Sequence, residues 1–194
     1  MNKKSIYIIL ISMIFLWGSF VVVSFFSDPM GFISYLGFAN SNSGTALSWA
    51  LALLTVILYC FSAAKISEVK YHMFKMDRLK VVAILAAVFA GIMEEVIYRK
   101  WIMDYLDSHD FSVIVQVSLS GLAFGIIHLL WGIKNRKAGV NAFISTSLLG
   151  FALAIVYLVS ERSLAPCIVA HFMITALIEP GLLVAAKEDK IGYW

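Results

Sequence analysis

Five ionisable side chains lie deep within long apolar runs of this sequence: Glu94, Glu95, Arg99, His128 and His171. Charged groups are costly in an apolar environment, and a chain that keeps them there usually needs them for function. His72 and His109 lie instead in polar segments, where we expect water to solvate them. Carboxyl and imidazole groups take up and release protons, so the buried set points to general acid–base chemistry.

The two adjacent carboxyls are expected to have different partners. One helix face carries residues at a spacing of four: Ala83, Ala87, Gly91, Glu95 and Arg99. Its small residues permit close helix approach, and Glu95 and Arg99 have the spacing and order of a favourable ion pair. Glu94 has no obvious partner in its own helix. An unpaired carboxyl away from water suits the role of a general base or acid.

The histidines lie on two further apolar segments. Gly121 and Gly125 form a G-x-x-x-G face, which predicts close packing, and His128 lies three residues beyond Gly125 on that face. In the last apolar segment Thr175 and Glu179 follow His171 by four and eight residues, just before Pro180-Gly181. Three helices therefore contribute to one predicted polar cluster.

Composition requires that these helices lie in a membrane. The 194 residues are 61% hydrophobic and 14% charged, with a mean hydropathy of +0.90, whereas soluble domains are about half apolar and a quarter charged. A spanning helix needs about 20 apolar residues. Six candidates are found near residues 5–26, 46–64, 81–107, 111–132, 139–160 and 164–186. We expect an all-α, polytopic membrane bundle that forms a single domain over residues 1–194.

Basic residues indicate how the spans are oriented. Of the 15 Lys and Arg, all but Arg99, Lys100 and Arg162 lie before the first span, in 65–80, in 134–137 or after the last span. The positive-inside bias predicts that both termini are cytoplasmic and that the 27–45 loop is outside. In 65–80, an amphipathic stretch on the inner leaflet is predicted from apolar residues at helical spacing: Ile66, Val69, Met73, Met76 and Leu79.

Depth in the membrane tests whether the polar residues can meet. Glu94 and His128 reach similar depths only if the third span continues through Trp101-Ile102-Met103 to a turn at 107–110. His171 reaches that depth only if the sixth span begins recessed. A site shared by all three residues therefore requires both features.

Other properties exclude alternatives. The net charge of +3 comes from scattered basic residues, which argues against a nucleic-acid partner. Cys60 and Cys167 lie in separate apolar runs, where a thiol behaves as a small hydrophobe rather than as half of a disulfide.

Three motifs resemble those of the CAAX protease and bacteriocin-processing (Abi) family of intramembrane proteases. Glu94-Glu95-Val96-Ile97-Tyr98-Arg99 looks like its E-E-x-x-x-R, Phe124-Gly125-Ile126-Ile127-His128 like its F-x-x-x-H, and His171 like the histidine of its third motif. The order and spacing agree, and the resemblance covers about residues 80–182. The family usually has Asn four residues after the third-motif histidine, where this chain has Thr175. A hydroxyl has one donor and an amide two.

The resemblance implies an endopeptidase of the cell membrane that acts on a membrane-associated protein or peptide. It implies that Glu94 and His128 activate a water and that His171, with Thr175, stabilises the oxyanion. Glu95, Arg99, Phe124 and Glu179 are expected to support the site, and no cofactor is expected. Membrane lipids and the peptide substrate are the expected partners.

Two alternatives remain open from the residues alone. Glu94, His128 and His171 supply the ligand types of a catalytic zinc site, although no H-E-x-x-H is present. Intramembrane Glu and His also occur in proton relays, so an ion-conducting bundle or a non-catalytic immunity protein is the other alternative. The spans lack the two matching halves that are typical of transporters.

Overall fold

The computed structural model describes residues 3–39, 43–133, 135–188 and 190, and within them every regular element is a helix. In chain order these are α1 (Lys3–Ser27), α2 (Pro29–Tyr35), α3 (Ala46–Ala63), α4 (Ser67–His72), α5 (Arg78–Glu95), the π-helix η1 (Val96–Met103), α6 (Asp104–Ser108), α7 (Val113–Ile127), the 3₁₀ segment η2 (His128–Ile133), α8 (Arg136–Val159) and α9 (Ala165–Lys187). Six helical stretches are long and apolar enough to cross a membrane. The protein is therefore a multi-pass membrane protein, which confirms the predicted fold class.

Helix starts follow residues that can cap them. The side chains of Thr45, Asp77 and Asn135 accept hydrogen bonds from backbone N–H groups in the first turns of α3, α5 and α8. Such caps satisfy donors that have no partner within the helix. The polar breaks in the sequence therefore start helices as well as separate them.

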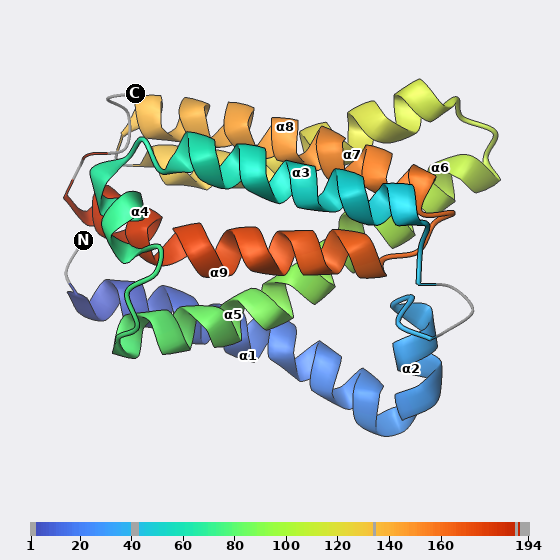
Figure 1. The fold of residues 1–194 in the computed structure, drawn as a ribbon, viewed down its shortest axis with the longest axis horizontal. Helices are drawn as coiled ribbons and strands as arrows, with labels where there is room; N and C mark the ends of the chain where they lie inside the picture. The colour runs from blue at the N-terminus through green and yellow to red at the C-terminus, as the bar shows by residue number, and fades with distance from the viewer. Residues whose placement is uncertain (1–2, 40–42, 134, 189, 191–194) are drawn as a thin grey trace.

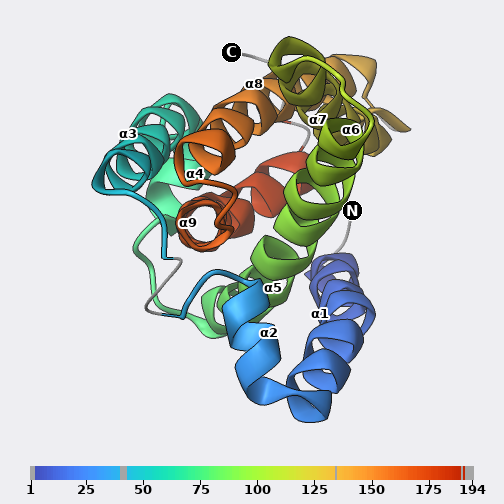
Figure 2. The same cartoon turned by 90° about the vertical axis from the view of Figure 1, so that its right-hand side faces the viewer.

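Helix α9 is the central element of the bundle. Viewed from the end, it lies inside a ring formed by α3, α8 and α5, while α1 and α2 lie at the periphery (Figure 2). Half of its most apolar stretch is buried inside the protein, against 22% for the first span. Leu164, Ala165 and Cys167 are completely buried at its start. The start of α9 is therefore enclosed by other helices.

The third span is one continuous helical stretch, Arg78–Ser108, formed by α5, η1 and α6. It continues past Met103 to a turn after Ser108, as the depth argument predicts. The sequence did not indicate that residues 96–103 within this span are π-helical. The fourth span also changes type, since α7 ends at Ile127 and a 3₁₀ segment begins at His128. Both changes occur next to the predicted site residues, and irregular helix is common at functional sites.

The segment at 65–80 differs from the predicted amphipathic stretch. Only Ser67–His72 forms α4, and α5 begins at Arg78. Ile66, Val69 and Met73 are buried in the protein core rather than in lipid, Leu79 is partly buried, and Met76 alone of the five predicted residues is exposed. The reason is that α4 packs on α9, where Gly181 leaves room for the backbone of Val69.

The basic segments gather at one end of the bundle. The start of α1, the segment containing α4, the start of α8 and the end of α9 all lie at the left in Figure 1, opposite α2 and α6. This common end agrees with the grouping of the basic residues in the sequence. Lys134 and both chain termini lie outside the described residues, so their predicted positions stay predictions. Cys60 and Cys167 are free and buried.

Candidate active site

The carboxylate of Glu95 is completely buried and uses both oxygens. Its Oε2 lies 3.0 Å from Arg99 Nε, one helical turn away, and its Oε1 accepts a hydrogen bond of 2.6 Å from His171 Nδ1 on α9. The ion pair with Arg99 agrees with the sequence prediction. The bond to His171 was not predicted.

Close packing of α5 and α9 explains the Glu95–His171 contact. A Cβ built on Gly91 would lie 3.3 Å from the backbone nitrogen of Phe172, so the two helices approach closely at this point. Glu95 lies one turn after Gly91 on the same face and therefore meets the residue next to Phe172. The small-residue face in the sequence indicated a close neighbour, but no pattern identified that neighbour as α9.

Arg99 is buried among three helices. Its Nη2 donates to the backbone oxygen of Gly150 at 3.2 Å, and its guanidinium carbon lies 5.1 Å from the ring centroid of Phe124. Neither its Nε nor its Nη1 has a hydrogen bond of good geometry within the described residues, so the contact with Glu95 is mainly coulombic. A buried cation held this way depends strongly on its one counter-ion.

Glu94 faces the other nitrogen of His171. Its Oε2 lies 3.7 Å from His171 Nε2, a distance suited to charge attraction but too long for a direct hydrogen bond. The Glu94 side chain retains 16% of its exposure, whereas that of Glu95 has none. Glu94 is therefore the member of the carboxyl pair that an incoming molecule can reach.

His128 and His171 both pack against the ring of Phe124. The Phe124 ring centroid is 5.0 Å from that of His128 and 5.5 Å from that of His171, both at steep angles. His128 Nδ1 lies 2.8 Å from the Phe124 carbonyl. A carbonyl can only accept, so Nδ1 donates and Nε2 is left for other partners. Sequence reasoning missed Tyr98, whose ring packs on Phe124 from η1.

The glycine seam that presents Phe124 and His128 lies between α7 and α8. A Cβ on Gly121 would lie 2.9 Å from the backbone nitrogen of Phe151, and one on Gly125 would lie 1.9 Å from Ser147 Oγ. The G-x-x-x-G prediction of close packing agrees with this seam, whose partner helix the sequence did not identify. Packing at this distance fixes the position of His128 relative to the rest of the bundle.

Thr175 and Glu179 continue along α9 beyond His171, and both are partly buried. Within the described part of the chain, no hydrogen bond of the Thr175 hydroxyl is found. Glu179 lies within electrostatic range of Glu94 and His171 but forms no ion pair with a described residue. Both residues therefore lie beside the contact network of Glu94, Glu95, Arg99 and His171 rather than in it.

The described residues include no group of three His, Cys, Asp or Glu side chains arranged to hold a metal ion. The two histidines nevertheless have a common arrangement, since each uses Nδ1 for a protein acceptor and has no direct hydrogen bond at Nε2 within the described residues. Such orientation of an imidazole serves acid–base chemistry as well as it serves ligation.

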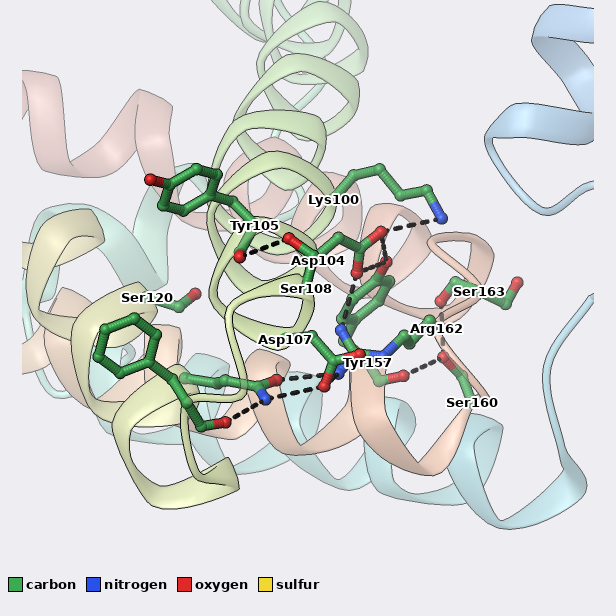
Figure 3. A network of polar contacts seen from close by, with 12 residues as sticks. Lys100, Asp104, Tyr105, Asp107, Ser108, Ser120, Tyr157, Ser160, Arg162 and Ser163 are labelled. Carbon is green, nitrogen blue, oxygen red and sulfur yellow. Dashed lines mark hydrogen bonds and ion pairs between the residues drawn. The ribbon is translucent and has the colours of Figure 1, made fainter.

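A second polar cluster, which was not predicted, lies around α6 (Figure 3), at the end of the bundle opposite α4 (Figure 1). Arg162, in the α8–α9 turn, contacts Asp104 at 2.8 Å, Asp107 at 2.7 Å and Gln116 at 2.9 Å. Asp104 also accepts from the Tyr157 hydroxyl at 3.0 Å and pairs with Lys100 at 3.2 Å. Both Glu161 and Arg162 adopt left-handed backbone angles, with φ of 57° and 62°. These contacts hold a strained turn that sets where α9 begins.

Fold and site together define the class of protein: a polytopic membrane protein with a buried cluster of carboxyl, guanidinium and imidazole groups. A family model described as Rce1-like, type II CAAX prenyl endopeptidase, matches residues 76–177, more than half of the chain, and the chain belongs to this family. The matched residues include Glu94 through Thr175 but end before Glu179. No curated protein and no solved structure matches the chain.

Proposed function

We propose that this protein is an intramembrane endopeptidase that hydrolyses a peptide bond of a membrane-associated protein or peptide. The observation that carries the proposal is the pair formed by Glu94 and His171 Nε2, 3.7 Å apart on two candidate membrane-spanning helices, with Glu94 partly exposed. Family membership supports the reaction class. The chemistry needs a base beside a water and donors beside the carbonyl oxygen, and the cluster has both kinds of group.

Glu94 is the proposed general base. Its carboxylate takes a proton from a water that His128 Nε2 helps to orient, and the resulting hydroxide attacks the peptide carbonyl. The protonated Glu94 then gives that proton to the leaving amine as the tetrahedral intermediate collapses, so the carboxylate is regenerated. His128 suits the orienting role because its Nδ1 proton is already held by the Phe124 carbonyl.

His171 and Thr175 are the proposed oxyanion donors. Since His171 Nδ1 donates to Glu95, the ring can also donate from Nε2 only as an imidazolium. Two carboxylates flank the ring and stabilise that charge. With Glu94, Glu95 and Arg99 charged, an imidazolium at His171 brings the net charge of this buried set to zero, which low-dielectric surroundings favour.

Comparison of membrane peptides tests the proposal. Cells that make the wild-type protein should contain new peptide termini in the membrane fraction that are missing both from cells without it and from cells with Glu94→Gln. Identical peptide sets in all three would favour the ion-conducting or immunity alternative. Cleavage that is lost with a chelator and restored by zinc, together with zinc in the purified protein, would favour the metal alternative over a cofactor-free site.

A further inference from the structure

Pro180 interrupts the hydrogen bonding of the central helix. It lies inside α9, which continues to Lys187. Proline has no N–H, so the carbonyl of Ala176, four residues earlier, has no donor at position 180. In a membrane no water replaces that donor, and a neighbouring group must do so.

Lys80 supplies donors at this point. It lies in the first turn of α5, is only 3% exposed, and its Nζ lies 2.7 Å from Ala176 O and 3.3 Å from Leu177 O. Within the described residues Lys80 forms no ion pair. A lysine that only marked the cytoplasmic side of the membrane would extend its ammonium into water, whereas this ammonium is committed to the helix.

The two elements that meet near Pro180, the start of α5 and the last part of α9, are each held by a further contact. Asp77 Oδ1 accepts a hydrogen bond of 3.0 Å from the backbone nitrogen of Lys80, which anchors the start of α5. On α9, a Cβ on Gly181 would lie 2.4 Å from the Cα of Val69, so α4 packs directly against the residue after Pro180. The helix is therefore held by Lys80 at residues 176 and 177 and by α4 at residue 181.

We propose that Lys80 is a positioning residue that replaces the hydrogen bond removed by Pro180 and so fixes the turn of α9 that carries Thr175 and Glu179. The carbonyls that it binds lie between these two residues in the sequence. Lys80 touches no reacting atom in this proposal. It acts through the placement of α9.

A double-mutant cycle in purified protein tests the proposal without any substrate. Lys80→Met should lower the midpoint of thermal unfolding by several degrees, because it leaves the Ala176 carbonyl without a donor. Pro180→Ala restores an N–H at that position, so Lys80→Met should lower the unfolding midpoint clearly less when Pro180→Ala is also present. Equal losses in both backgrounds would overturn the proposal.

Pro166 provides the matched control. It lies in the first turn of α9, where its missing N–H removes no hydrogen bond. Lys80→Met should therefore lower the midpoint of thermal unfolding by the same amount with Pro166→Ala as without it. If Pro166→Ala reduced that loss as much as Pro180→Ala does, the proposal would also be overturned. If Lys80→Met yields no folded protein, recovery of the folded yield by Pro180→Ala, but not by Pro166→Ala, gives the same decision.

The effect on turnover rests on the proposed peptidase function. At a temperature where all variants are folded, Lys80→Met should lower kcat with little change in KM, and Pro180→Ala should restore kcat. An unchanged kcat in folded Lys80→Met would show that Lys80 does not position the site residues of α9. If the wild-type protein cleaves no peptide, the proposed function fails, while the unfolding cycle still decides whether Lys80 supports α9.

Discussion

Glu94 and Glu95 are neighbours with different surroundings, and exchanging each carboxylate for an amide should separate their roles. In Glu94→Gln the amide nearly keeps the shape but cannot take a proton from water. Peptide cleavage should fall by about 10²-fold or more, with little change in thermal unfolding. Assay of the membrane peptides and an unfolding curve in detergent check both parts, and turnover near that of the wild type would contradict the assignment.

Glu95→Gln should lower stability as well as activity. The exchange leaves Arg99 as a buried cation without a counter-ion and weakens the hydrogen bond from His171. Breaking one side of a buried pair costs about 3–5 kcal/mol. Glu94→Gln is the matched control in the same unfolding experiment, because it makes the same chemical change one residue away. Equal stability of the two variants would argue against this division of roles.

Thr175 tests whether a hydroxyl replaces the amide usual in the family. If it donates to the oxyanion, Thr175→Val should lose about 10²-fold in kcat, and Thr175→Asn should keep or raise it. Kinetic assays of the two variants beside His171→Ala give the measurement. If Thr175→Val cleaves at the wild-type rate while His171→Ala is inactive, Thr175 only packs and does not donate to the oxyanion.

For single residues, the sequence identified which ones belong to the candidate site better than it identified which of them contact one another. The cost of burying charge singles out Glu94, Glu95, Arg99, His128 and His171 without any structure. The Glu95–His171 bond joins residues that lie 76 positions apart, and helical periodicity says nothing about which distant helix faces a given residue. The same limit hid Lys80, which looks like one more basic residue at a membrane boundary.

Among the elements, the start of α5 depends on Asp77. The Lys80 N–H bound to its carboxylate lowers the pKa of Asp77 below its usual 3.8. Its stabilisation is therefore complete above pH 3.8 and is lost as the pH falls through the lower, folded pKa. Asp77→Ala should cost about 1 kcal/mol near neutral pH.

Asp77→Asn is the control for that charge. Asparagine caps a helix about as well as aspartate, so this variant should match the wild type near pH 7 and should not share its loss of capping in acid. Unfolding curves at about pH 7 and about pH 3 measure the difference. An Asp77→Asn protein as unstable near neutral pH as Asp77→Ala would show that the side chain does not cap α5.

Helix type was less predictable than helix position. The apolar runs located all six spans, because length and hydropathy suffice for that. The π-helix at Val96–Met103 and the burial of Ile66, Val69 and Met73 depend on tertiary packing, which an apolar pattern does not contain. A lipid-facing and a protein-facing residue look alike in such a sequence.

For the whole molecule, the grouping of basic segments predicts that the α4 end faces the cytoplasm. Lys70 in α4 and His109 directly after α6 are exposed, and these helices lie at opposite ends of the bundle (Figure 1); both native cysteines are buried. In intact cells a membrane-impermeant thiol reagent should therefore label His109→Cys but not Lys70→Cys. The wild-type protein, which should stay unlabelled, is the control. The opposite labelling pattern would reverse the orientation.

The central position of α9 has a consequence for biosynthesis. Among the six spans it leaves the ribosome last, yet it occupies the middle of the bundle and carries His171. The five spans made earlier must therefore stay loosely associated, with a space open for α9. During that interval Glu95 has Arg99, one turn away in the same helix, but not His171. A nascent chain thus has no complete site, and any peptidase activity begins only after synthesis has passed α9.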